Sequence, residues 1–119
     1  MGSQAKKVSK MRLLRHADKA SFVTEKPAAA IHFDANWDAQ YRAATRNAMA
    51  DAEQAVADGV NFGEVDCDSD PKLAKSIPIL NVPAVAYYRG GKLVGALIGA
   101  GQNVRLQLER ALRGYPIRE

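Results

Sequence analysis

The sequence contains one cysteine, Cys67, in 119 residues. A disulfide within the chain needs a second thiol, and a zinc site built on cysteine needs two or more thiolates. The sequence therefore excludes a disulfide scaffold and a cysteine-based zinc centre, and we expect neither a metal nor another cofactor. A single thiol is typical of proteins in reducing compartments, so we expect a cytoplasmic location.

Long apolar runs are missing as well. The sequence has no window of about 18 apolar residues, the length that a membrane-spanning helix requires. Segment 1–10 carries charges but no apolar stretch of the kind that a signal peptide needs. We therefore expect no membrane partner.

The net charge of +4 is concentrated at the N-terminus. Five of the 17 basic residues precede the first acidic one, which leaves 12 basic against 13 acidic residues in the rest of the chain. We expect a flexible basic leader over 1–10, a nearly neutral folded domain over 11–114 and a C-terminal tail over 115–119. The body has no RNA-recognition or helix-turn-helix motif, which argues against nucleic acid as a partner.

Strand-like and helix-like segments alternate along the chain and predict an α/β fold. The helices are recognised by apolar spacings of three and four and by Pro or Gly at their ends, the strands by short apolar runs. Gly90-Gly91 suits the tight turn of a hairpin. The predicted strands span 11–14, 28–33, 60–65, 84–89 and 92–98, and the predicted helices span 18–25, 39–58, 70–75 and 103–113. The order of elements is βαβαβαββα.

Five motifs in this order resemble those of thioredoxins. They are Phe33–Trp37 for F-x-A-x-W, Val65–Pro71 for V-D-x-D-x-N-P, Val82–Ala84 for I-P-T, Arg89–Lys92 for the hairpin turn and Ile98–Ala100 for V-G-A. The resemblance covers roughly residues 11–113. It implies the thioredoxin fold, in which helices flank a central mixed sheet on both faces.

The resemblance fails where the family has its catalytic C-G-P-C sequence. The matching positions are Asp38, Ala39, Gln40 and Tyr41, so neither the attacking nor the resolving thiol is present. Dithiol–disulfide exchange at this site is chemically impossible. Asp38 can still cap the helix that follows, because a carboxylate is favourable at a helix N-terminus.

A second pair of substitutions agrees with the first. Thioredoxins hold a buried acid under the active site and a lysine on the neighbouring strand, and the resemblance places His32 and Glu64 at these positions. We expect a buried hydrogen bond between them on adjacent parallel strands. A general-base role for His32 is the alternative, but no thiol lies above it to serve.

Cys67 remains as the one candidate for thiol chemistry. It falls near the end of the third predicted strand, where a lone cysteine usually acts as a small core residue. The flanking carboxylates of Asp66 and Asp68 oppose formation of a thiolate.

The docking groove of the family is retained in the sequence. The resemblance implies a shallow apolar groove formed by Trp37, Val82, Pro83, Gly99 and Ala100, with a cis Val82–Pro83 bond beside it. The leading hypothesis is a redox-inactive module of chaperone or assembly type that binds an unidentified protein or peptide. The alternative is a thiol-disulfide oxidoreductase or redox sensor, with a role in redox homeostasis, that acts through Cys67.

Overall fold

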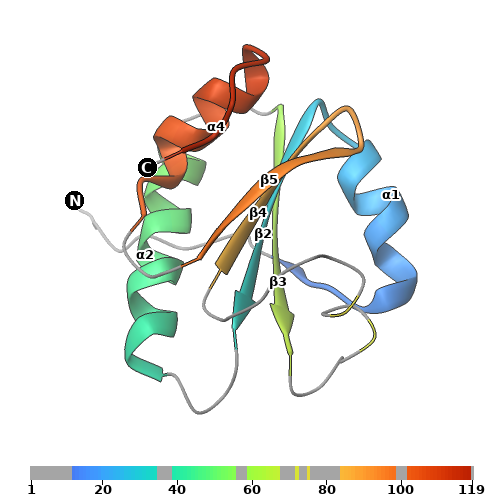
Figure 1. Ribbon diagram of the computed structural model, residues 1–119. Coiled ribbons are helices and arrows are strands. Elements are labelled where there is room, and N and C mark those ends of the chain that lie inside the picture. The colour runs from blue at the N-terminus through green and yellow to red at the C-terminus, as the bar shows by residue number, and fades with distance from the viewer. Residues whose placement is uncertain are drawn as a thin grey trace, which may run out of the picture.

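The computed structural model describes residues 12–34, 39–55, 59–67, 72, 75, 84–98 and 102–118. Helices and strands alternate along the described residues up to β3, and a hairpin and a last helix follow (Figure 1). The strands are β1 (Arg12–Leu13), β2 (Ala28–Asp34), β3 (Val60–Asp66), β4 (Ala84–Arg89) and β5 (Lys92–Ile98). The helices are the 3-10 turn η1 (His16–Asp18), α1 (Lys19–Thr24), α2 (Ala39–Ala55) and α4 (Val104–Leu112).

The five strands form one mixed sheet in the order β1-β3-β2-β4-β5. β3 runs parallel to β1 and β2, while β4 runs antiparallel to both β2 and β5. Helix α1 covers one face of the sheet, and α2 and α4 cover the other (Figure 1). This is the α/β arrangement that the motif order predicts.

The sheet separates two apolar cores. Alternate residues of β2 point to opposite faces, as the period of a strand requires, and β2 is buried on both. The core under α1 contains Leu14, Phe22, Val23, Ala29, Ile31, Phe33, Val65, Ala86 and Tyr88. The core under α2 and α4 contains Ala28, Ala30, Met49, Ala52, Val60, Phe62, Val85, Tyr87, Val104 and Leu108.

Gly63 allows the first core to close on β3. A Cβ atom at this position would lie 2.7 Å from Leu14 Cδ1 and 2.8 Å from Phe22 Cζ. Both neighbours are buried, so they have little space to move away. The missing side chain lets Leu14 and Phe22 of α1 pack directly on β3.

The boundaries of α4 follow from its flanking residues. The Asn103 side chain accepts a hydrogen bond from the Leu106 N–H at 3.1 Å and so caps the first turn. At the other end Gly114 adopts φ 78°, and the Tyr115 N–H donates to the Arg110 carbonyl at 2.8 Å. This left-handed glycine ends the helix and turns the chain back.

The segment after α4 packs against that helix. The buried amide of Gln107 donates to the Arg118 carbonyl at 2.6 Å and accepts from the Arg118 N–H at 2.9 Å. Ile117 lies over Gly95 of β5 and contacts the core under α4. Residues 115–118, predicted as a tail, therefore extend the cover of the sheet.

The predicted boundaries agree best for the hairpin. Strands β4 and β5 have the predicted bounds, and Gly90 and Gly91 adopt φ 59° and 82° between them. Of the first strand predicted over 11–14, β1 covers Arg12–Leu13 and Met11 lies outside the described residues. Leu14 still donates its N–H to the Glu64 carbonyl at 2.8 Å while its side chain enters the core under α1. Of the helix predicted over 70–75, Lys72 and Lys75 are helical and the other residues lie outside the described ones. No helix of the described residues has both the length and the apolar character needed to cross a membrane.

Candidate functional site

The site that the motifs indicate lies at the carboxyl ends of β2 and β3. Asp34 pairs with Asp66 at the end of these parallel strands, and α2 begins shortly afterwards at Ala39. Ala39, Gln40 and Tyr41 therefore form the first turn of α2. Of the sequence-predicted site residues, Trp37, Asp38, Val82, Pro83, Gly99 and Ala100 lie outside the described part of the chain.

His32 and Glu64 lie near the carboxyl ends of β2 and β3, on the face of the sheet that α2 covers. They are register partners on β2 and β3, so their side chains project on the same face of the sheet. His32 Nδ1 lies 3.3 Å from Glu64 Oε2, and the imidazole is fully buried. The structure thus brings together the two residues of the predicted polar pair.

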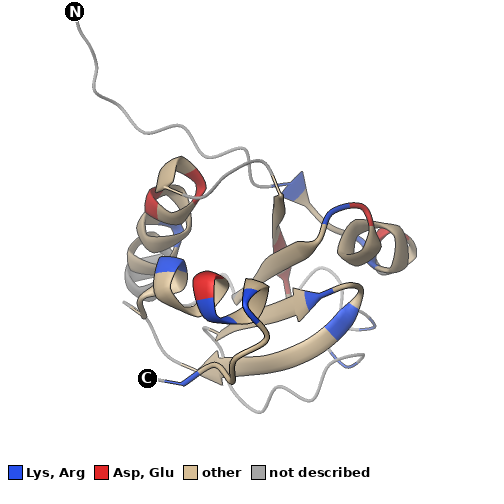
Figure 2. Ribbon diagram, turned by 90° about the horizontal axis from the view of Figure 1, so that it is seen from above, with Lys and Arg blue, Asp and Glu red and all other residues tan. Residues whose placement is uncertain are grey.

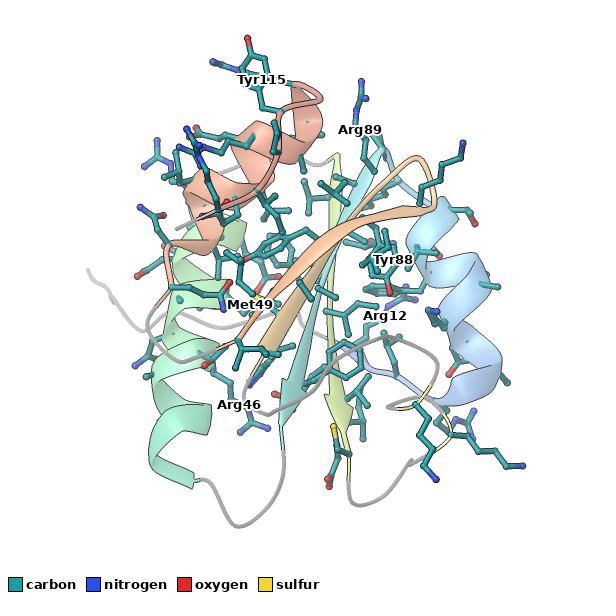
Figure 3. The ribbon with its side chains drawn as sticks, in the orientation of Figure 1. Arg12, Arg46, Met49, Tyr88, Arg89 and Tyr115 are labelled. Atoms are coloured by element: carbon teal, nitrogen blue, oxygen red, sulfur yellow. The ribbon has the colours of Figure 1, made fainter. Side chains whose placement is uncertain are left out.

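A third residue, Arg46 of α2, completes the cluster. Its Nε donates to Glu64 Oε2 at 2.7 Å and its Nη2 donates to Glu64 Oε1 at 2.5 Å. The planar guanidinium thereby binds both carboxylate oxygens, which is the strongest geometry for such a pair. Arg46 reaches this position from the middle of α2, where its side chain projects beside the sheet (Figure 3).

The cluster fixes the charge of Glu64. Burial raises the pKa of Glu64, but the hydrogen bonds and charge of Arg46, together with the contact with His32, outweigh it and lower the pKa from 4.5 to about 2. The carboxylate is therefore ionised at neutral pH. Arg46 of α2 neutralises this charge, so the ion pair between Arg46 and Glu64 links the helix to β3 of the sheet.

The imidazole of His32 makes fewer hydrogen bonds than the Glu64 carboxylate. Neither Nδ1 nor Nε2 has a hydrogen-bond partner of good geometry, although Nδ1 lies close to Glu64. The ring is fully buried. This placement suits a packed core residue better than a general base.

Cys67 lies on the opposite side of the sheet from this cluster. It follows the last residue of β3, is half-buried, and packs against the core under α1. Helix α2 lies on the other face (Figure 1). The sheet therefore separates the thiol from α2 and from the cluster of His32, Glu64 and Arg46. Within the described ranges no group of three or more His, Cys, Asp or Glu side chains could hold a metal ion.

Comparison with known proteins agrees with the fold. The family model described as thioredoxin matches residues 11–112. The chain belongs to the thioredoxin family. This thioredoxin-family chain also superposes on solved thioredoxins, as the order and direction of its strands require.

Three structures illustrate how far the similarity extends. A Halobacterium salinarum thioredoxin mutant gives a TM-score of 0.74 at 13% identity, with 99% of each chain covered. Mitochondrial thioredoxin 3 of Saccharomyces cerevisiae gives 0.71 at 21%, covering 87% of this chain and 94% of its own. A Malassezia sympodialis thioredoxin gives 0.69 at 16%, covering 98% and 100%. No curated protein sequence matches this thioredoxin-family chain.

Sequence reasoning missed Arg46. The sequence does indicate that Glu64 needs a partner, because it lies within a mostly apolar predicted strand. A buried carboxylate requires a cation or several hydrogen-bond donors. Helix α2 offers Arg46 one position after the buried Thr45, at the border of its inward face. Only the three-dimensional register of α2 against β3 shows that the two side chains meet.

Proposed function

We propose that this chain is a thioredoxin-fold protein that performs no dithiol exchange and instead binds a protein or peptide partner in the cytoplasm. The observation that carries the proposal is the location of its one thiol. Cys67 follows β3 and packs on the α1 side, whereas the chain has Asp38 and Tyr41 at the two catalytic cysteine positions. A single thiol on the α1 face of the sheet has no second thiol to resolve a mixed disulfide within the chain.

The buried cluster supports the same proposal. An acid that helps a buried cysteine lose its proton must itself take up and release a proton. Here the equivalent position is His32, which is enclosed, and its neighbour Glu64 is kept ionised by Arg46. The charges of Arg46 and Glu64 satisfy each other within the fold, so the cluster stabilises the packing of α2 on the sheet.

The groove positions supply the binding half of the proposal. Trp37, Val82, Pro83, Gly99 and Ala100 match the family residues that form a shallow apolar groove next to α2. Loss of the catalytic thiols removes none of them. An extended partner peptide would pair with the backbone before Pro83 and place an apolar side chain against Trp37.

A capture experiment with matched variants tests the proposal. The wild-type protein, Trp37→Ala and Cys67→Ser are immobilised in parallel and exposed to native lysate, and bound proteins are quantified by mass spectrometry. Proteins retained by the wild type should also be retained by Cys67→Ser. Their binding to Trp37→Ala should be weaker, by about 2 kcal/mol in binding free energy if Trp37 is a central anchor. The reverse order would overturn the proposal.

A thiol sensor is the second candidate, because Cys67 is only half-buried and so can meet a reactive partner at the edge of the sheet. Such a sensor would form an intermolecular disulfide through Cys67. Its signature is a mixed disulfide on a non-reducing gel that disappears in Cys67→Ser. The acidic neighbour Asp66 makes the thiolate unfavourable, which places this candidate second.

A further inference from the structure

A groove opens at the end of the sheet opposite to the motif site. It lies between the β4-β5 hairpin and the chain that follows α4, and its volume is about 440 Å³. Arg89, Lys92, Leu93 and Val94 line it from the hairpin, and Gly114 and Tyr115 line it from the end of α4. Arg89 pairs with Ala28, the first residue of β2, so this hairpin groove is a full strand length away from Asp34.

Both walls of the hairpin groove are fixed by hydrogen bonds or close packing. The Gly90 N–H donates to the Pro27 carbonyl at 2.9 Å, and a Cβ at Gly91 would lie 2.7 Å from Thr24 of α1. The hairpin turn is thus seated against the end of α1. On the other wall the backbone bonds around Gly114 set the position of Tyr115. A ligand would therefore meet a preformed surface and little ordering entropy would be lost on binding.

The electrostatics of the hairpin groove favour an anion. Residues 84–98 and 110–118 contain no acidic residue, and Figure 2 shows Lys and Arg but no Asp or Glu on the hairpin. Within the described part of the chain Arg89, Lys92 and Arg113 form no ion pair. Gly114 leaves room beside the Arg89 guanidinium, because a Cβ there would lie only 3.3 Å from its Nη1. Arg89 and Tyr115 project at the same end of the molecule (Figure 3).

Apolar side chains and an open strand edge lie beside these cations. Leu93, Val94 and Tyr115 are exposed, Tyr115 to 58%. Val94 is the extra residue of a β-bulge, since Tyr87 pairs with Gly95 and Tyr88 pairs with Leu93. A bulge commonly re-aims a side chain at an edge. β5 is the last strand of the sheet in the described residues, so the backbone groups of its outer edge face away from β4.

We propose that the hairpin groove binds an extended acidic peptide segment of a partner protein. The segment adds to the outer edge of β5, places an apolar side chain between Val94 and Tyr115, and directs its carboxylates to Arg89 and Lys92. An open strand edge with an apolar floor recognises peptide backbone and side chains, whereas nucleic acid would need more phosphate contacts than these cations supply. This site is distinct from the Trp37 groove and does not depend on it.

A fluorescence-anisotropy titration tests the proposal. The probe is a labelled peptide of about eight residues in which two glutamates flank one phenylalanine at alternate positions, with threonines between them. A second peptide has glutamine in place of each glutamate. The protein variants are Arg89→Gln combined with Lys92→Gln, Tyr115→Ala, and the control Arg105→Gln, which removes an exposed cation from α4.

The acidic peptide should bind at low salt and weaken as salt rises, while the glutamine peptide binds at least about tenfold more weakly. The double variant should lose about tenfold or more in affinity, Tyr115→Ala should also lose affinity, and Arg105→Gln should change it by about twofold or less. Amide shifts in NMR spectra of the wild type should gather at 89–95 and 111–117. Unchanged melting temperatures would show that the variants fold.

Three results would overturn the proposal. The first is equal affinity of the wild type and the double variant, or amide shifts confined to the end of the sheet at Asp34 and Asp66. The second is a single-stranded RNA oligonucleotide that displaces the peptide and binds more tightly. The third is a concentration-dependent dimer that is lost in the double variant while no peptide binds, because the groove would then be an interface between two copies of this chain.

Discussion

Replacing Arg46 by methionine tests the buried cluster most sharply. Methionine keeps an unbranched apolar stem beside β3 but removes both hydrogen bonds to Glu64, which are 2.7 and 2.5 Å long. The fall of the Glu64 pKa from 4.5 to about 2 corresponds to about 3 kcal/mol of favourable interaction with the ionised form. The Arg46 side chain is 47% exposed, so solvent screening reduces the expected loss to about 1–2 kcal/mol at neutral pH.

The pH dependence has a definite sign. Because the folded pKa of Glu64 is lowered, its stabilisation is fully present above 4.5 and is lost as the pH falls through about 2. The wild type should therefore be more stable than Arg46→Met at neutral pH. The two proteins should converge as the pH falls through about 2 and below it, where Glu64 becomes protonated in both.

Urea unfolding followed by circular dichroism at a series of pH values measures this difference. Arg105→Met is the matched control, since Arg105 on α4 makes only an exposed pair with Glu109 at 3.8 Å. Its loss should stay below about 0.5 kcal/mol at all pH values. A cost of Arg46→Met no larger than that of this control, or one that stays constant as the pH falls through about 2, would refute the stabilising role of the ion pair between Arg46 and Glu64.

Three further substitutions probe the same fold by urea unfolding. Glu64→Ala should cost about 1–3 kcal/mol, because it removes the acceptor of both Arg46 hydrogen bonds and the carboxylate beside the buried His32, and a neutral effect would contradict the link between α2 and β3. Gly63→Ala should cost about 1–3 kcal/mol through overpacking, whereas Gly59→Ala, whose Cβ would meet nothing closer than 3.8 Å, should cost less than half as much. Tyr88→Phe should be neutral or stabilising, because its buried hydroxyl has no hydrogen-bond partner, while Tyr87→Phe should cost about 1 kcal/mol with the 2.6 Å bond to Gln102; equal effects would contradict this.

The strands and helices could be predicted because local signals agree with the tertiary structure. Gly90 and Gly91 dictate a tight turn, and the bounds of β4 and β5 follow from it. The register of His32 against Glu64 could be predicted from the motifs that flank them, and the two residues are partners in the parallel pairing of β2 and β3. These features depend on residues close together in sequence or on a known topology.

Other features depend on contacts that no local pattern reveals. Arg46 and Glu64 are 18 positions apart, and their meeting depends on how far α2 is rotated against the sheet. The Gln107 amide makes two hydrogen bonds with the backbone of Arg118. The apolar pattern of α4 predicts only an ordinary polar surface residue at this position. The hairpin groove arises from two turns, at Gly90 and Gly114, that are remote in sequence and become neighbours only in the fold.

The reduction of insulin by dithiothreitol, followed by turbidity, shows directly whether this chain catalyses dithiol exchange. The wild type, Cys67→Ser and a thioredoxin with an intact dithiol are compared at equal concentration, with reductant alone as the baseline. Because the chain has one thiol and no second thiol to resolve a mixed disulfide, the wild type and Cys67→Ser should both match the baseline while the dithiol protein accelerates precipitation. Acceleration by the wild type that disappears in Cys67→Ser would contradict the account.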